Sequence, residues 1–199
     1  MDCNFPDLYE NLELCPGETS LPGIVPEIYG CSKRQITNRP ALPELTSDIT
    51  DMGAIATLTG EFKCAADTGF HRIDILSPSS GVKVEAQGEW PNISFLSTLT
   101  AVHAGTGPEA AGYCRLASHD DMIYVVRQRS GRFRVIGSWI DNTKVSPSMD
   151  LGQAVTDACG TTLEISSTDL APAPFYEGKL PLVGGLVLDC KTGEVTDAI

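Results

Sequence analysis

The sequence has little positive charge and no long hydrophobic run. Lys and Arg total 14 against 26 Asp and Glu, which gives a formal net charge of −12 at pH 7. Charge-driven binding to nucleic acid needs a broad basic surface, so this composition argues against specific nucleic-acid binding. No apolar stretch approaches the roughly 18 residues of a membrane-spanning helix, and we expect no membrane partner. The first residues lack the basic and apolar regions of a signal peptide, so we expect none.

The seven cysteines lack the spacing of a disulfide framework or a zinc site. They are widely separated, odd in number, and form no C-x-x-C pair. Paired or closely spaced cysteines are typical of disulfide-rich domains and structural zinc sites. We therefore predict reduced thiols made in a cytosol, several of them filling a hydrophobic core.

No catalytic motif is recognisable. The sequence contains no G-x-S-x-G, H-E-x-x-H, P-loop or G-x-G-x-x-G before a helix. The run His119, Asp120 and Asp121 offers metal-ligating residue types, but a polar turn between a helix and a strand explains it better. Cys114, on the apolar face of a predicted helix, is interpreted as a core thiol rather than a nucleophile. We predict that the protein is not an enzyme and has no catalytic residue, metal or cofactor.

Alternation of apolar and polar residues predicts a mainly β protein. Residues 55–66 and 82–89 alternate cleanly with period two, and residues 70–77 do so more weakly. Short connections, with a turn signal at 77–81, predict that these strands form an antiparallel meander. Residues 92–105 fit either a helix or a strand, and their Ser and Thr content favours the strand.

One segment, residues 108–118, predicts a helix. Thr106 is a candidate N-cap, Pro108 suits the first turn, and Glu109 favours the positive end of the helix dipole. The helix would have one apolar face, formed by Ala110, Tyr113, Cys114 and Ala117.

Prolines divide the chain into three parts. Residues 1–50 hold six prolines and predict an extended N-terminal arm or edge strand, with a strand expected through 27–36. Residues 171–199 predict a proline linker followed by a small hairpin, and we expect both terminal segments to contact other subunits. Residues 51–170 then form the main domain, an antiparallel β-sandwich or barrel with one flanking helix.

Positive charge is concentrated in a predicted hairpin, residues 122–138, where four arginines fall within eight residues: Arg127, Arg129, Arg132 and Arg134. A two-residue turn at Ser130-Gly131 would pair Arg129 with Arg132 and Arg127 with Arg134, so all four would project from one face. A bulged turn would shift this register. Two explanations stay open: a solvated face, or a basic tip that docks on an acidic surface of a neighbouring copy.

Acidic residues occupy the polar faces of the alternating strands. Glu61, Glu85 and Glu89 each follow this pattern, and we expect them on a solvent-filled or lumenal surface. Nothing in their spacing indicates a catalytic carboxylate pair.

The order of these elements resembles that of bacteriophage tail tube proteins. A strand ending in VEAQGE is followed by the segment with the helix PEAAGYCRLAS, then by the long hairpin MIYVVRQRSGRFRVIGS and by LGQAVTDACGTTLEISSTD. With the opening DLYENLELCPG and LPGI, the chain is most similar to tube proteins of phages and prophages of Bacteroidetes-type gut bacteria. The resemblance covers about residues 20–176.

This resemblance implies a structural virion protein. It implies a β-sandwich whose copies join sheets side by side into hexameric rings, and rings that stack into a tail tube through which DNA is ejected without specific binding. It implies partners among other copies and other tail or connector proteins, production in the host bacterial cytoplasm, and a final location in the virion tail. Long hairpins bridge rings in that family, which gives the arginine hairpin a role.

Two other functions fit the same sequence. A head–tail connector or tail terminator can share the fold, and a β-sandwich module that binds a glycan or a protein belongs to a different class. The low aromatic content, 7%, argues against the binding module, whose ligand contacts need exposed aromatic side chains.

Overall fold

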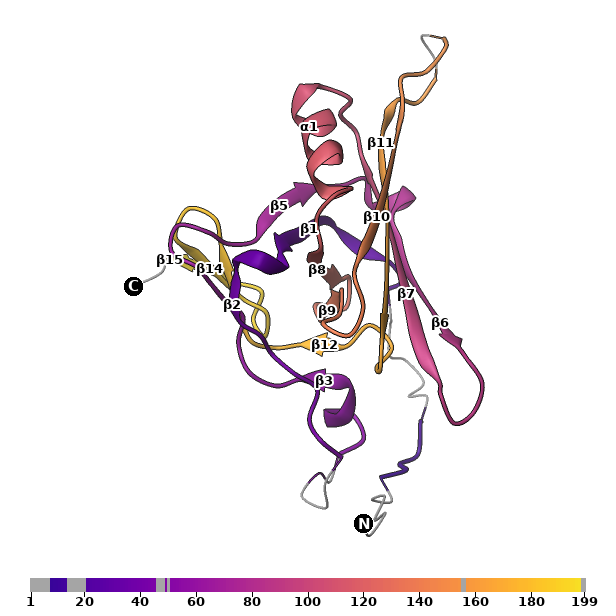
Figure 1. The fold of residues 1–199 in the computed structure, drawn as a ribbon, viewed down its shortest axis with the longest axis vertical. Coiled ribbons are helices and arrows are strands. Elements are labelled where there is room, and N and C mark those ends of the chain that lie inside the picture. The colour runs from indigo at the N-terminus through magenta and orange to yellow at the C-terminus, as the bar shows by residue number, and fades with distance from the viewer. Residues whose placement is uncertain (1–7, 14–20, 46–48, 50, 155–156, 198–199) are drawn as a thin grey trace.

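The computed structural model describes residues 8–13, 21–45, 49, 51–154 and 157–197. Of these residues 46% are in strands and 11% in helices. The described part of the chain is therefore mainly β with several sheets and one flanking α-helix, as the sequence predicts (Figure 1).

The largest sheet has six strands in the order β3-β12-β9-β8-β1-β5. Neighbours are antiparallel except β3 and β12. The strands are β3 (Thr57–Leu58), β12 (Phe175–Tyr176), β9 (Phe133–Ile136), β8 (Met122–Gln128), β1 (Ile24–Ser32) and β5 (His71–Asp74). The strand expected within the proline-rich first 50 residues thus exists as β1. It lies inside the sheet, between β8 and β5, rather than at an edge.

A second sheet has four antiparallel strands in the order β10-β11-β7-β6. The strands are β10 (Lys144–Asp150), β11 (Gly160–Asp169), β7 (Ser94–His103) and β6 (Gly81–Gln87). The segment 92–105 is therefore a strand. Its β-branched and hydroxyl residues suit a central strand with one buried face and one polar face.

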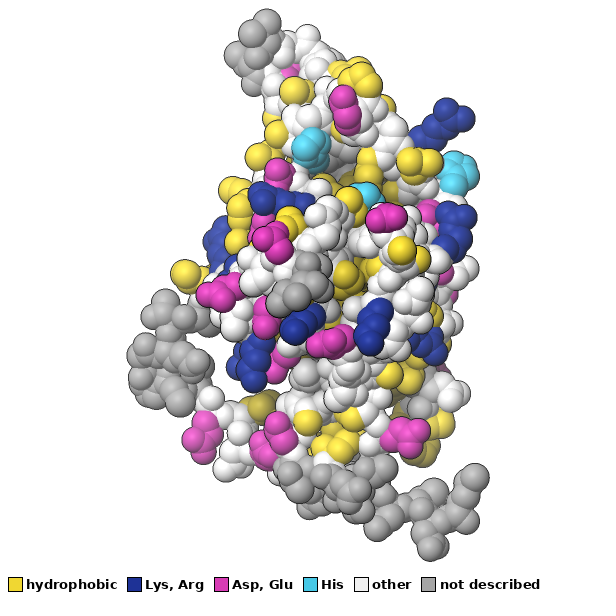
Figure 2. Space-filling model, turned by 90° about the vertical axis from the view of Figure 1, so that its left-hand side faces the viewer, with side chains coloured by type: hydrophobic (Ala, Val, Ile, Leu, Met, Phe, Trp, Pro, Cys, Tyr) yellow, Lys and Arg dark blue, Asp and Glu magenta, His cyan; other side chains and the backbone are white. Residues whose placement is uncertain are grey.

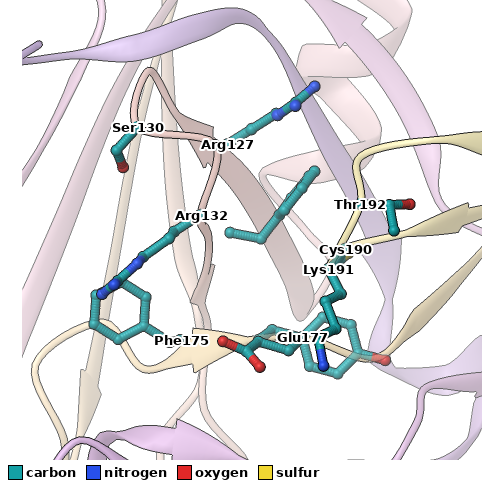
Figure 3. A pocket seen from close by; sticks show the side chains of 11 residues that line it. Arg127, Ser130, Arg132, Phe175, Glu177, Cys190, Lys191 and Thr192 are labelled. Atoms are coloured by element: carbon teal, nitrogen blue, oxygen red, sulfur yellow. The ribbon is translucent and has the colours of Figure 1, made fainter.

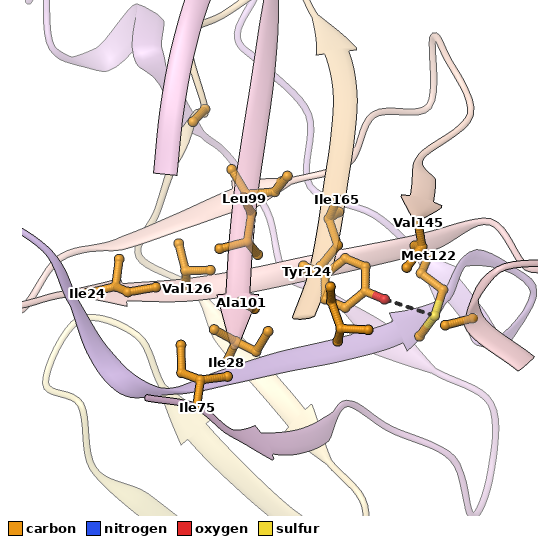
Figure 4. Packing of buried hydrophobic residues seen from close by; sticks show 14 of the residues in the cluster. Ile24, Ile28, Ile75, Leu99, Ala101, Met122, Tyr124, Val126, Val145 and Ile165 are labelled. Atoms are coloured by element: carbon orange, nitrogen blue, oxygen red, sulfur yellow. Dashed lines mark hydrogen bonds between the residues drawn. The ribbon is translucent and has the colours of Figure 1, made fainter. Parts of the chain in front are cut away.

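The two sheets pack face to face over a core that we call the sandwich core (Figure 4). Aliphatic side chains dominate it because alternate residues of long strands point inward. Within it, the Tyr124 hydroxyl donates a hydrogen bond to Met122 Sδ at 3.3 Å. The six-stranded sheet contributes Ile24, Ile28, Tyr124, Val126 and Ile136, and the four-stranded sheet contributes Leu99, Ala101, Val145, Leu163 and Ile165.

The helix α1 (Pro108–Ala117) closes one end of this core. Its predicted apolar face is confirmed, since Cys114 and Ala117 are buried and Tyr113 packs against the core. The predicted cap is wrong. Gly107 occupies the N-cap position, and no side chain accepts a hydrogen bond from the first turn.

The opposite face of the six-stranded sheet carries a second core, which we call the aromatic core. It is covered by a three-stranded sheet of β13 (Lys179–Leu182), β14 (Leu186–Asp189) and β15 (Val195–Asp197), and by a strand pair of β2 (Ile36–Asn38) and β4 (Lys63–Cys64). The expected C-terminal hairpin thus gains a third strand. It buries Leu180, Leu188 and Cys190 against its own domain.

Two sequence predictions about the early strands are wrong. Residues 55–66 are not one strand: a 3-10 turn (Ala54–Ala56) leads into β3, and β4 follows after Gly60, whose φ of +99° breaks the extended path. The three strands do not form a meander either. β5 pairs with β1 and β6 pairs with β7, because the turn at 77–79 carries the chain from one sheet to the other.

The described cysteines are free thiols, of which Cys31, Cys114 and Cys190 are buried. Burial raises the pKa of the Cys190 thiol to about 12, so it stays protonated and behaves as a small apolar side chain. Cys3 and Cys15 lie outside the described residues.

Candidate interaction surfaces

The arginine hairpin, β8 and β9 with the turn between them, has a different register from the expected one. Val126 pairs with Arg134 and Arg127 pairs with Phe133. The Gln128 amide donates to the Arg132 carbonyl at 2.8 Å, and Gly131 has a φ of +92°. The turn is therefore a three-residue loop with glycine in the left-handed region rather than a two-residue turn. The four arginines do not share one face, and the expected pairing is wrong.

Arg134 is held by its own chain. One of its terminal nitrogens donates to the carbonyls of Pro172 and Ala173 at 3.1 and 2.9 Å. Its guanidinium carbon lies 3.9 Å from the centre of the Phe175 ring. Burial, with the charge of Arg132 beside it, lowers the pKa of Arg134. These contacts join β9 to the segment before β12, so the role of Arg134 is structural.

The other three arginines are more open. Arg127 lies over the Phe133 ring at 5.4 Å, and Arg132 over the Phe175 ring at 5.6 Å. Arg129 is exposed and donates to the Ser77 hydroxyl at 2.9 Å. Within the described residues none of the hairpin arginines has a carboxylate oxygen within 4.0 Å, whereas Lys33, Arg34, Arg72 and Lys83 each form an ion pair. Their role in contacts between subunits stays a prediction.

A pocket of about 290 Å³ opens between the hairpin turn, β12 and the turn after β14 (Figure 3). We call it the basic pocket. Three cationic side chains line it, Arg127, Arg132 and Lys191, against the single carboxylate of Glu177. Figure 3 shows Arg132 lying against the Phe175 ring on one side of the pocket and Lys191 on the other. The pocket is therefore locally positive, although the whole chain has a net charge of −12.

The face shown in Figure 2 has no broad basic patch. On the face shown in Figure 2, basic and acidic side chains are interspersed across the middle of the molecule, and the lower part shows acidic side chains without basic ones. This face therefore lacks the broad basic surface that binding along a nucleic-acid backbone requires.

The three candidate lumenal carboxylates are all exposed, but they come from different places. Glu85 lies on β6 and pairs with Lys83 at 2.6 Å. Glu89 follows β6 in the turn to β7, and Glu61 lies between β3 and β4 at the other sheet. Their exposure agrees with the predicted polar faces, and their lumenal position stays a prediction.

The outer face of the four-stranded sheet is rich in hydroxyl groups. Cross-strand pairs place Thr98 beside Ser166 and Thr100 beside Glu164, with Ser146 next in line on β10. Because residues alternate along each strand, Leu99 and Ile165 point inward while these side chains point outward. The hydroxyl side chains of this outer face are Thr98, Thr100, Ser146, Ser148, Thr162, Ser166 and Thr168.

Large apolar side chains are exposed where the four-stranded sheet ends. Trp90 and Ile93, in the turn between β6 and β7, are 86% and 48% exposed. Met149 and Leu151, at the end of β10, are 38% and 75% exposed. Figure 1 shows the β10–β11 connection and the β6–β7 turn extending beyond the body in opposite directions.

The run from His119 to Asp121 has a structural explanation. Asp121 pairs with Lys33 at 2.6 Å and Asp120 with Arg34 at 2.9 Å, so both carboxylates anchor the end of β1. In the part of the chain that the structure describes, no three His, Cys, Asp or Glu side chains lie close enough to hold a metal ion together. The described helices include none long and apolar enough to span a membrane.

The sequence predicts the arginines of the basic pocket but not the residues that line its other side. Lys191 and Thr192 come from the turn after β14, and Phe175 and Glu177 from β12 and the residue after it. No local pattern marks these residues, because their meeting depends on how the C-terminal sheet packs. Comparison with known proteins finds no matching family, curated protein or solved structure.

Proposed function

We propose that the protein is a structural subunit of a bacteriophage tail that assembles into stacked rings, the tail tube. One observation carries the proposal: both ends of the four-stranded sheet extend beyond the core and bear large exposed apolar side chains. Trp90 and Leu151 are 86% and 75% exposed, so the described residues cover little of either side chain. Exposed apolar groups grouped on projections are typical of surfaces that another protein covers.

The sheet edges offer a second contact. β6 and β10 are the outer strands of the four-stranded sheet, and each is seven residues long. A strand at an edge has unpaired backbone groups that can bind a strand of another copy. Joining such edges in turn around an axis would close a ring, as the resemblance to tube proteins implies.

The hydroxyl-rich outer face of this sheet suits a conduit. Of its two lysines, Lys83 pairs with Glu85, and Lys144 lies at the start of β10 beside Ser166. Ser and Thr side chains make up most of the remainder. A duplex passing such a surface meets hydrogen-bonding groups without the dense positive charge that would retain it. In an assembled tube this face would line the channel.

Negative-stain electron microscopy of the purified chain tests the proposal. Rings that stack into tubes would support it, and rings that never stack would favour a connector or terminator. Substituting Leu151 and Trp90 by Ser should reduce the fraction in assemblies, while circular dichroism stays unchanged because both side chains lie outside the cores. Leu116→Ser is the matched control, since Leu116 is 73% exposed on α1.

One observation favours a different function, a module that binds an anionic ligand. The basic pocket of about 290 Å³ combines cationic side chains with aromatic rings, as ligand sites often do. A monodisperse monomer whose melting temperature rises with an added anion would favour this function.

A further inference from the structure

The N-terminal part of the chain includes an exposed acidic segment, residues 8–13, with the sequence LYENLE. Tyr9 and Leu12 are 86% and 89% exposed, and Glu10 and Glu13 are exposed as well. The first 20 residues carry five acidic residues and no Lys or Arg. An exposed segment with both apolar and acidic side chains has the composition of a docking motif rather than of an inert spacer.

The basic pocket has the complementary chemistry. Its cations come from two elements on opposite sides: Arg127 and Arg132 from the arginine hairpin, and Lys191 from the turn after β14. Phe133 and Phe175 hold the two guanidinium groups at 5.4 and 5.6 Å from the ring centres. Cations that lie over aromatic rings and have no carboxylate of the described residues within 4.0 Å are suited to an anionic group, because the rings limit the side-chain entropy lost on binding.

The dimensions of the segment suit a two-sided pocket. In an extended chain, Glu10 and Glu13 are separated by about 10 Å, since each residue advances the chain by about 3.3 Å. Two carboxylates at that separation can meet cations on both sides of the pocket. The Tyr9 ring can stack on a guanidinium group, which adds a cation–π contact to the ion pairs.

We propose that the basic pocket binds the acidic segment of a second copy of this chain. The proposal rests on the proposed self-assembly and names the contact. In Figure 1 the segment lies on the side of β6 and β7, whereas β14 and its turn lie on the opposite side of the molecule. Residues 8–13 do not line the pocket of their own chain, so the segment is available to a neighbour's.

A peptide-binding experiment tests the contact without requiring assembly. The peptide is a fluorescein-labelled copy of residues 7–14, and the receptor is the full chain carrying Glu10→Gln and Glu13→Gln, so that its own segment does not compete. We expect binding by fluorescence anisotropy. Adding Arg132→Glu and Lys191→Glu to this receptor should weaken it by about tenfold or more, because the contact depends on complementary charge.

Two controls accompany this comparison. Lys63→Glu with Arg115→Glu changes the net charge equally at exposed sites away from the pocket, and binding should be unchanged. A peptide with both glutamates replaced by lysine should bind only the receptor whose pocket charges are reversed. Binding of the lysine peptide to the charge-reversed receptor would show that the segment and the pocket pair directly, rather than through a general effect of net charge.

Three results would overturn the proposal. The first is no binding, or equal binding by all receptors. The second is displacement of the peptide by duplex DNA at lower concentration, which would assign the pocket to phosphate groups. The third is a wild-type chain that stays monomeric and excludes the peptide, which would place the segment in its own pocket. Rings without peptide binding would reject this contact alone, and peptide binding without rings would reject the tube alone.

Discussion

The two faces of the six-stranded sheet are covered in different ways. On one face, long regular strands build the sandwich core, in which one of fifteen buried residues is aromatic. On the other, short strands and turns build the aromatic core, in which five of twelve are aromatic. The aromatic core is therefore filled by fewer and larger side chains than the sandwich core. Each of them therefore carries more of the packing, and the basic pocket borders this irregular side.

The largest expected loss comes from the regular core. Leu163, 2% exposed at the centre of β11, belongs to the sandwich core that both sheets build, and Leu163→Ala would leave a cavity there. We expect the free energy of unfolding to fall by about 2–5 kcal/mol in urea denaturation. Leu116→Ala, on the exposed side of α1, should change it by less than about 0.5 kcal/mol. Equal small changes would mean that the sandwich core is loosely packed.

Removing the Tyr176 hydroxyl should lower the free energy of unfolding, because this group makes two hydrogen bonds in the aromatic core. The buried Tyr176 hydroxyl donates to the Lys179 carbonyl at 2.7 Å and accepts a hydrogen bond from the Phe62 amide at 3.1 Å. Tyr176→Phe keeps the ring but leaves both backbone groups unpaired, at a cost of about 1–3 kcal/mol. Hydrogen exchange should show faster exchange at Phe62 and in β13. Unchanged exchange there would show that water replaces the hydroxyl.

Two arginines of one hairpin should differ in the same measurement. Arg134→Met removes two hydrogen bonds to carbonyls near β12 and should destabilise the fold by about 1–3 kcal/mol, while keeping the apolar contact with Phe175. Arg132→Met, at an exposed position, should change stability by less than about 0.5 kcal/mol. If both substitutions cost the same, Arg134 is not the structural member of the pair.

A smaller effect with a defined pH dependence is expected at Asp169, at the end of β11. Burial raises the pKa of its carboxyl, although the Leu170 amide and the Ser138 hydroxyl oppose this. A raised folded-state pKa favours the protonated form, so the ionised carboxylate weakens the fold at neutral pH. Asp169→Asn should therefore stabilise slightly at pH 7. The gain should shrink as pH falls through the raised pKa and vanish below the ordinary Asp pKa, as thermal melts can measure.

Sequence patterns predict the regular face far better than the irregular one. The strand β6 and the helix α1 follow clear periodicity, and the structure contains both. The strand β7, where the pattern fits a helix or a strand, and the strand β8, predicted from a turn signal, are present as well. Residues 55–66 show an equally clear alternation, yet Gly60 interrupts them and the pieces join different sheets. Periodicity reports which side chains prefer burial. It does not report whether the backbone between them can stay extended, nor which strand becomes the neighbour.

The candidate sites show the same limit. The clustered arginines are visible in the sequence, but one glycine in the left-handed region lengthens the turn and shifts their register, so the four do not share one face. Lys191 and Phe175 enter the basic pocket only through tertiary packing. Charge composition thus predicted a basic feature, and its shape depended on contacts between distant segments.

The position of β1 inside the largest sheet sets an order of events during synthesis. β1 pairs with β5 and with β8, so it has no complete partner until residues near 128 have been made. The basic pocket also needs residues 190–192, which follow the acidic segment by on the order of ten seconds at usual translation rates. The acidic segment of a nascent chain is therefore exposed well before the basic pocket of the same chain can form. If the proposed contact forms, the first pockets that such a segment meets belong to older, finished copies, and growth would proceed by addition to completed subunits.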